Sequence, residues 1–140
     1  MKAIYTATAT ATGGRNGQVK TDNGVLDLAV RTPKAMGGAN DDYTNPEQLF
    51  AAGYSACFDS ALNHIIAREQ VKTGGTSVTA KVSIGMIGNG AYGLAVELAV
   101  NISEVSPEEA QRLADRAHEV CPYSNATRNN IEVKITTTNN

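Results

Sequence analysis

The segment that begins at Asn45 constrains the fold most strongly, because it carries the signals of one long helix. Asn45 is a favourable N-cap, Pro46 suits the first helical position, and Gln48 can complete a capping box. The sequence predicts a helix from here to about Gln70. Small and apolar residues cover most of its circumference, so we expect this helix to lie buried in the middle of the fold.

Alternating polar and apolar residues predict short strands on both sides of this helix. Turns rich in glycine and asparagine separate the strands, as is typical of hairpins. The predicted strands cover residues 3–12, 18–20, 25–30, 77–86, 93–102 and 131–137. With two helices the order becomes β-β-β-α-β-β-α-β, which favours an α+β fold with antiparallel sheet over regular βαβ units.

The second helix is predicted to begin at Ser106, which can form a capping box with Glu109. It is interrupted at Cys121 and Pro122, and a single strand follows. Its apolar face consists of Ala110, Leu113, Ala114 and Ala117. No linker divides the chain, so we expect residues 1–140 to form a single domain.

Charge and hydropathy argue against nucleic-acid and membrane partners. Twelve basic residues face fourteen acidic ones without any run of like charge, so the basic surface of a nucleic-acid-binding protein is absent. The first residues lack the apolar core of a signal peptide, and the apolar segment 46–68 is too polar to span a bilayer. We therefore expect a cytoplasmic protein, in which a cysteine pair is more often catalytic or metal-binding than a permanent disulfide.

The two cysteines, Cys57 and Cys121, are the candidate reactive groups. Cys57 lies inside the small-residue helix, where the ordinary explanation is a buried and inert thiol, since burial raises a thiol pKa. A nucleophilic Cys57 would need a cation, and its own helix offers none within one turn. At Cys121, the helical turn that Pro122 begins can supply backbone N–H groups to a thiolate. The sequence Cys-Pro-Tyr-Ser is similar to a glutaredoxin motif, but too little chain follows it for that fold.

Arg15 is the candidate for the missing cation, and Glu47 is the candidate to hold Arg15 in place. Arg15 lies in the turn Gly13–Gly17, whose glycines allow a close approach to other elements. Glu47 precedes Cys57 by ten residues, about 80° away around the helix, and can hold an arginine near the thiol. Both residues also have ordinary explanations, because Arg15 suits an exposed turn and Glu47 complements the helix dipole.

Two further functions stay open on the residues alone. His64 and His118 could join Cys57 and Cys121 in a zinc site, although neither pair has the usual C-x-x-C spacing. The chain could also bind an apolar ligand while both thiols stay inert. Candidate residues for an apolar pocket are Phe50, Met36 and Tyr123.

Three motifs occur in order along the chain: Gly13–Gly17, Asn45–Phe58 and His118–Ala126. Together they resemble the organic hydroperoxide resistance (Ohr) branch of the Ohr/OsmC family of thiol-dependent peroxidases, and the resemblance runs nearly end to end. It implies an OsmC-like α+β fold, in which antiparallel sheets wrap around the long central helices of an intertwined homodimer. It also implies that organic and fatty-acid hydroperoxides are the substrates, that a lipoylated protein or another dithiol is the reductant, and that no metal or cofactor takes part.

The resemblance further implies a role for each of four residues. Cys57 would be the peroxidatic thiolate and Cys121 the resolving thiol that forms a disulfide with it. Arg15 would stabilise the thiolate and polarise the peroxide, and Glu47 would orient Arg15. All four positions carry the residue that the family pattern requires. Asp59 follows Cys57 by two residues, about 200° around the helix, so its carboxylate is expected to face away from the thiol.

Overall fold

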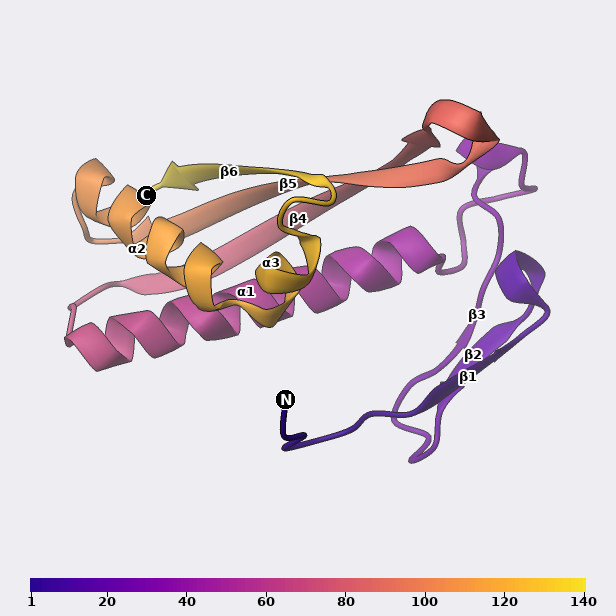
Figure 1. Ribbon diagram of the computed structural model, residues 1–140, viewed down its shortest axis with the longest axis horizontal. Helices are drawn as coiled ribbons and strands as arrows, with labels where there is room; N and C mark the ends of the chain where they lie inside the picture. The colour runs from indigo at the N-terminus through magenta and orange to yellow at the C-terminus, as the bar shows by residue number, and fades with distance from the viewer. The chain divides into compact units, whose positions relative to one another are not determined.

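A computed structural model describes all 140 residues, which form two compact units, residues 1–49 and 50–140 (Figure 1). The first turn of helix α1 belongs to the N-terminal unit. The elements are β1 (Ala9–Thr12), η1 (Gly14–Asn16), β2 (Gln18–Thr21), β3 (Asp27–Ala29), η2 (Lys34–Met36), α1 (Pro46–Glu69), β4 (Gly75–Met86), η3 (Gly88–Gly90), β5 (Tyr92–Ser103), α2 (Pro107–Val120), α3 (Pro122–Thr127) and β6 (Glu132–Thr138). This order confirms the predicted succession of strands and helices, with α3 as an added short helix. That the whole chain is one domain stays a prediction.

In the N-terminal unit, β1, β2 and β3 form an antiparallel sheet in sequence order. The first strand was predicted over residues 3–12 but begins only at Ala9. The reason is its partner: β2 is four residues long and pairs with residues 9–12 alone. Beyond β3, Val30 pairs with Thr44 in an isolated parallel bridge, which closes the loop between them.

In the C-terminal unit, β4 and β5 form a long antiparallel hairpin. Gly75 lies opposite Ser103 at its open end, and Met86 lies opposite Tyr92 next to the turn. The fold is α+β as predicted, but the last strand, β6, pairs with β5 in parallel, which differs from the antiparallel pairing expected for the sheets. Parallel neighbours need a crossover connection, and α2 with α3 supplies it between β5 and β6. Figure 1 shows α2 and α3 in this connection.

One face of this sheet and the helices share a hydrophobic core. Alternate residues of the strands point into it, whereas the residues between them are exposed. The buried strand residues are Val96, Leu98, Val100 and Ile102, and the fully buried face of α2 is Ala110, Leu113, Ala114 and Ala117, as predicted. Ser106 caps α2 by accepting a hydrogen bond from the Glu109 backbone at 3.2 Å.

Helix α1 begins and ends close to the predicted residues. The Asn45 side chain accepts a hydrogen bond from the Gln48 backbone at 2.9 Å, which confirms the cap. The expectation that α1 is buried all round is wrong for the single chain, because the core covers only one side of it. That side consists of Tyr54, Phe58, Ala61, Leu62 and Ile65, whereas an exposed stripe consists of Ala52, Ala56, Ser60, Asn63 and Ala67. None of the helices has a stretch long and apolar enough to cross a bilayer.

Candidate active site

A tight turn presents Arg15 in the N-terminal unit. Gly13 adopts a φ of 72°, a backbone conformation that favours glycine, and its carbonyl accepts a hydrogen bond from the Asn16 backbone at 3.1 Å. At Gly17 the backbone passes so close to Thr12 that a Cβ atom would lie 1.7 Å from the Thr12 carbonyl oxygen. The two glycines therefore let the chain reverse tightly between β1 and β2, with Arg15 in the single turn η1.

Arg15 forms a two-pronged ion pair with Glu47 in the first turn of α1. Its Nη2 lies 2.6 Å from Glu47 Oε1 and its Nη1 lies 2.8 Å from Oε2. The Glu47 side chain is 13% exposed and that of Arg15 is 32% exposed. The hydrogen bond from Arg15 lowers the pKa of Glu47, and the hydrogen bond to Glu47 raises the pKa of Arg15. The geometry holds the guanidinium in one orientation, as the functional interpretation of these two residues requires.

The lowered pKa of Glu47 predicts how the ion pair responds to acid. Its stabilising effect should be complete above the ordinary pKa range of a glutamate and should disappear as the pH falls through the lower, folded-state value. Glu47→Gln should therefore reduce the free energy of unfolding by about 0.5–1 kcal/mol at pH 7, a modest value because Arg15 is partly exposed. Urea unfolding at pH 7 and at pH 3 measures this difference.

A suitable control is Glu108→Gln, which removes a first-turn carboxylate of α2 that forms no ion pair, unlike its neighbour Glu109. The difference in the free energy of unfolding between the wild type and Glu47→Gln should be smaller at pH 3 than at pH 7. A difference of equal size at both pH values would show that the ion pair with Arg15 does not cause it.

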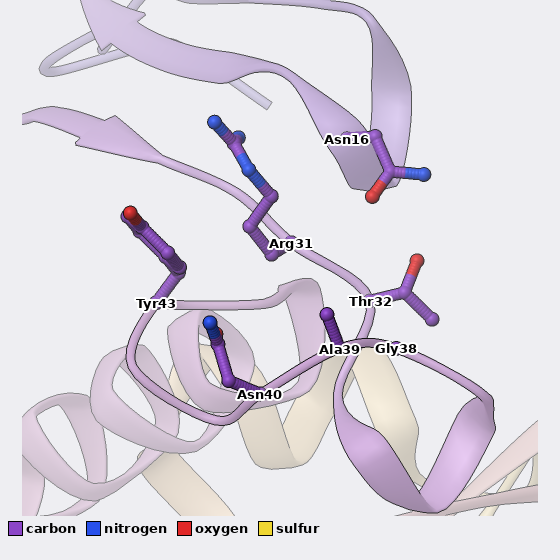
Figure 2. Close-up of a pocket in the computed structure, with 7 residues that line it drawn as sticks. All are labelled: Asn16, Arg31, Thr32, Gly38, Ala39, Asn40 and Tyr43. Atoms are coloured by element: carbon purple, nitrogen blue, oxygen red, sulfur yellow. The ribbon is translucent and has the colours of Figure 1, made fainter.

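Arg31 ties this turn to the segment that leads into α1. Its Nη1 donates hydrogen bonds to the carbonyl oxygens of Gly17, at 2.8 Å, and Val30, at 2.7 Å. Its backbone N–H donates to the Thr44 carbonyl at 3.0 Å, and its guanidinium lies 5.0 Å from the Tyr43 ring centroid. Figure 2 shows Arg31 at a small pocket of about 150 Å³, together with Asn16, Thr32, Gly38, Ala39, Asn40 and Tyr43. Arg31 thus fixes the turn of Arg15 against the chain that precedes Glu47.

In the C-terminal unit the two cysteines meet, although they are 64 positions apart in the sequence. Cys57 lies on α1, and Cys121 is both the C-cap of α2 and the N-cap of α3. The Cys121 thiol donates to Cys57 Sγ over 3.7 Å, and both thiols are free. Cys121 is fully buried, whereas Cys57 is partly exposed. The structure thus brings the two sulfur atoms close together while leaving one of them accessible.

Burial raises the pKa of the Cys57 thiol above its ordinary value. The backbone of Tyr123 opposes this by a hydrogen bond that lowers the pKa, whereas the neighbouring Cys121 thiol raises it. The direction agrees with the prediction that an apolar helix disfavours the thiolate. Asp59 is engaged elsewhere, because it accepts a hydrogen bond from Thr76 of β4 at 2.7 Å. The surroundings of Cys57 in the C-terminal unit therefore disfavour its thiolate form.

A cavity of about 430 Å³ opens beside Cys57. It is lined by Cys57, Ser60, Ala61, His64, Val120 and Pro122. The three residues that the sequence offered as pocket lining are not among them. Phe50 and Tyr123 instead pack on Tyr54, with ring centroids 6.0 and 5.6 Å from its ring, and Met36 belongs to the N-terminal unit. Cys57 accordingly lies at a cavity that also contains the polar side chains of Ser60 and His64.

The zinc hypothesis lacks a donor set. No group of three or more His, Cys, Asp or Glu side chains lies close enough together to hold a metal ion. His64 is exposed at the cavity, whereas His118 Nδ1 lies 2.9 Å from Ser124 Oγ. A structural zinc site needs four such ligands in tetrahedral geometry.

The sequence did not reveal a buried polar cluster beside the thiols. Its members are Tyr54 of α1, Ser124 and Thr127 of α3, and His118 of α2. The only signal was the position of polar residues one helical turn from each cysteine, which by itself does not indicate a contact.

Comparisons with known proteins agree with the motifs. The family model described as OsmC-like protein matches residues 38–136. A protein of Xanthomonas axonopodis pv. citri named organic hydroperoxide resistance protein is 49% identical over 136 residues, which cover 96% of this chain and 95% of that protein. The crystal structure of an organic hydroperoxide resistance protein from Elizabethkingia anophelis is 68% identical, with a TM-score of 0.97 and full coverage of both chains. That of OhrB from Bacillus subtilis is 42% identical, with a TM-score of 0.88, and the match covers 97% of this chain and 100% of that one.

Proposed function

Because the chain belongs to the OsmC/Ohr family, and is similar to members named organic hydroperoxide resistance proteins, we propose that it is a thiol peroxidase that reduces organic hydroperoxides to alcohols. Alkyl and fatty-acid hydroperoxides are the proposed substrates, and resistance to oxidative stress is the proposed role. The observation that carries the proposal is the pair of free thiols 3.7 Å apart, one buried and one at a cavity. Such a pair can give up two electrons and two protons to a peroxide, and become a disulfide, without a metal or cofactor.

In the proposed first step the Cys57 thiolate attacks the distal oxygen of the hydroperoxide. The O–O bond breaks, the distal oxygen stays on sulfur as a sulfenic acid, and the other oxygen leaves as an alkoxide that takes up a proton to become an alcohol. The cavity at Cys57 is open enough to admit an alkyl group, with Ala61, Val120 and Pro122 as its apolar lining.

In the proposed second step Cys121 resolves the sulfenic acid. Its sulfur attacks the Cys57 sulfur, the S–O bond breaks, a disulfide forms and the oxygen leaves as water. The sulfur atoms are 3.7 Å apart in the dithiol state and must approach to about 2.0 Å, so only a small shift of the two side chains is needed. Disulfide formation protects Cys57 from irreversible oxidation. A lipoylated protein or another dithiol would then restore both thiols by two exchange reactions.

Arg15 and Glu47 complete the proposed site. Burial raises the pKa of Cys57, so a guanidinium beside the sulfur is needed to favour the thiolate. Arg15 suits this role because its ion pair with Glu47 presents the guanidinium in a fixed orientation. That this ion pair and the thiols act together is part of the proposal.

A homodimer in the cytoplasm is also part of the proposal. Its support is the exposed stripe of α1, whose small residues allow another helix to approach closely. A compartment that keeps thiols reduced suits an enzyme whose resting state is a dithiol.

The test is peroxide consumption by the purified chain. With cumene hydroperoxide and a dithiol such as dihydrolipoamide, the chain should reduce the peroxide to the alcohol catalytically. After one equivalent of peroxide without reductant, intact-mass measurement should show the loss of two hydrogen atoms, and peptide mapping should place the crosslink at Cys57 and Cys121. A chain that consumes no peroxide would instead fit the alternative of an apolar-ligand-binding protein with inert thiols.

Cys121→Ser should separate the two steps. The variant should still reduce one equivalent of peroxide, because the attacking sulfur is intact, but Cys57 should then advance to the sulfinic and sulfonic acids under excess peroxide. Mass spectrometry should show additions of two or three oxygen atoms that the wild type acquires much more slowly. Equal over-oxidation of the two proteins would exclude Cys121 as the resolving thiol.

A further inference from the structure

A continuous chain of hydrogen bonds connects α1 to α3 next to the two thiols. Tyr54 Oη lies 3.0 Å from Ser124 Oγ and 3.1 Å from Thr127 Oγ1, and Ser124 Oγ lies 2.9 Å from His118 Nδ1. Tyr54 and Ser124 are completely buried, and Thr127 is 6% exposed. No buried side-chain nitrogen or oxygen of the protein lacks a hydrogen-bond partner. The cluster is therefore a fully satisfied polar network inside an apolar core, a type that favours one arrangement of its elements.

The direction of this hydrogen-bond chain follows from its last member. The Thr127 hydroxyl lies 2.9 Å from the Tyr123 carbonyl oxygen, and it must donate there because a carbonyl only accepts. Thr127 therefore accepts from Tyr54, which in turn accepts from Ser124. Ser124 accepts from the Nδ1–H group of His118. Each hydroxyl has one proton, so removing the Tyr54 hydroxyl takes one hydrogen bond from Ser124 and one from Thr127.

The network lies one helical turn from each sulfur. Tyr54 precedes Cys57 by three residues on α1, and Ser124 follows Cys121 by three residues. Residues three apart on a helix share a face. The hydrogen bonds between Tyr54 and α3 therefore connect α1, which carries Cys57, to the short helix that Cys121 caps.

We propose that Tyr54, Ser124 and Thr127 are positioning residues for disulfide closure, holding α3 against α1 so that Cys121 stays within reach of Cys57. The inference rests on the proposed function, in which the Cys121 sulfur displaces water from the Cys57 sulfenic acid. This step needs two sulfur atoms to approach each other, whereas the attack on peroxide uses the Cys57 sulfur alone. Loss of the network should therefore slow the second step and leave the first unchanged.

Single-turnover kinetics of Tyr54→Phe test this separation. The change removes one oxygen atom and keeps the buried ring. Consumption of one equivalent of cumene hydroperoxide should stay within twofold of the wild-type rate. Disulfide formation, followed by quenched-flow alkylation and mass spectrometry, should slow by about tenfold, and the sulfinic fraction of Cys57 should rise accordingly. Tyr92→Phe is the matched control, because Tyr92 is 65% exposed.

A pair of variants at Thr127 distinguishes the loss of a hydroxyl group from a general disturbance of the packing. Thr127→Val keeps the shape of the side chain but removes the hydroxyl, and should reproduce the Tyr54→Phe result. Thr127→Ser keeps the hydroxyl and should restore disulfide formation to near the wild-type rate. If Tyr54→Phe or Thr127→Val slowed both steps equally, or slowed neither, the positioning role would be refuted.

A redox titration keeps this test independent of the peroxidase assay. Because the network holds Cys121 near Cys57, its loss should lower the equilibrium constant of disulfide formation as well as the rate. A tenfold fall in that constant in Tyr54→Phe raises the reduction potential of the Cys57–Cys121 disulfide by about 30 mV, measured in a dithiothreitol redox buffer. If the wild type consumed no peroxide, the proposed function would fail while this potential still tested the positioning role. An unchanged potential together with unchanged closure kinetics would overturn the inference even in an active peroxidase.

Discussion

Cys57→Ser is expected to abolish peroxide turnover, with a loss on the order of 10³-fold or more in kcat/KM for cumene hydroperoxide. The alcohol of serine is hardly ionised at neutral pH, and it cannot form the sulfenic acid on which the second step depends. The substitution is nearly isosteric, and Cys57 is only partly buried, so the fold should persist. Coupled oxidation of a dithiol, followed by peroxide titration, measures the effect.

Ser60→Ala provides the matched control for this prediction. Ser60 lines the same cavity as Cys57 and has no assigned role in the chemistry, so its loss should leave turnover within a few-fold of the wild type. Substantial peroxide consumption by Cys57→Ser would mean that Cys121 or another group reacts with peroxide directly, and the assignment of Cys57 as the attacking sulfur would be wrong.

Arg15→Ala is expected to have the second largest effect, a loss of about 10²-fold in the rate of peroxide reduction at pH 7, comparable to removing one preorganised charge-stabilising donor. Burial already raises the pKa of Cys57, and without the guanidinium that pKa should rise further. The thiolate fraction at neutral pH then falls. The loss should become smaller as the pH increases, because alkaline solution restores the thiolate, although not the polarisation of the peroxide.

The pH dependence of the single-turnover rate measures this effect, with thiolate absorbance near 240 nm as an independent readout. Arg15→Lys keeps the charge but cannot form the two-pronged contact with Glu47, so its rate should lie between those of the wild type and Arg15→Ala. Glu47→Gln should cause a milder loss than Arg15→Ala, because it affects orientation rather than the supply of charge. An unchanged rate and pH profile in Arg15→Ala would exclude the electrostatic role.

Local signals in the sequence predicted the helices well. The side chains of Asn45 and Ser106 cap α1 and α2 as expected, because a cap depends only on residues within three positions of it. The four alanine and leucine residues predicted for the inner face of α2 are all buried. These features needed no knowledge of the rest of the chain.

Features that depend on distant partners could not be predicted in this way. The parallel pairing of β6 with β5 follows from the path of the chain through α2 and α3, and alternation of residues is the same in both strand directions. The proximity of Cys57 and Cys121 was implied only by the family resemblance, since a separation of 64 positions in the sequence gives no geometric information. The hydroxyl network was missed because Tyr54, Ser124 and Thr127 look like ordinary helix residues until the helices are packed.

The parallel placement of β6 also has a consequence for the newly made chain. The segment that carries Cys121 lies between β5 and β6, and α2 packs on both strands, so its packing is complete only after β6 has left the ribosome. At 5–20 residues per second, Cys57 emerges roughly 3–13 s ahead of Cys121, because the two cysteines are 64 positions apart. In the proposed mechanism, a Cys57 oxidised during that interval would have no resolving thiol in its own chain.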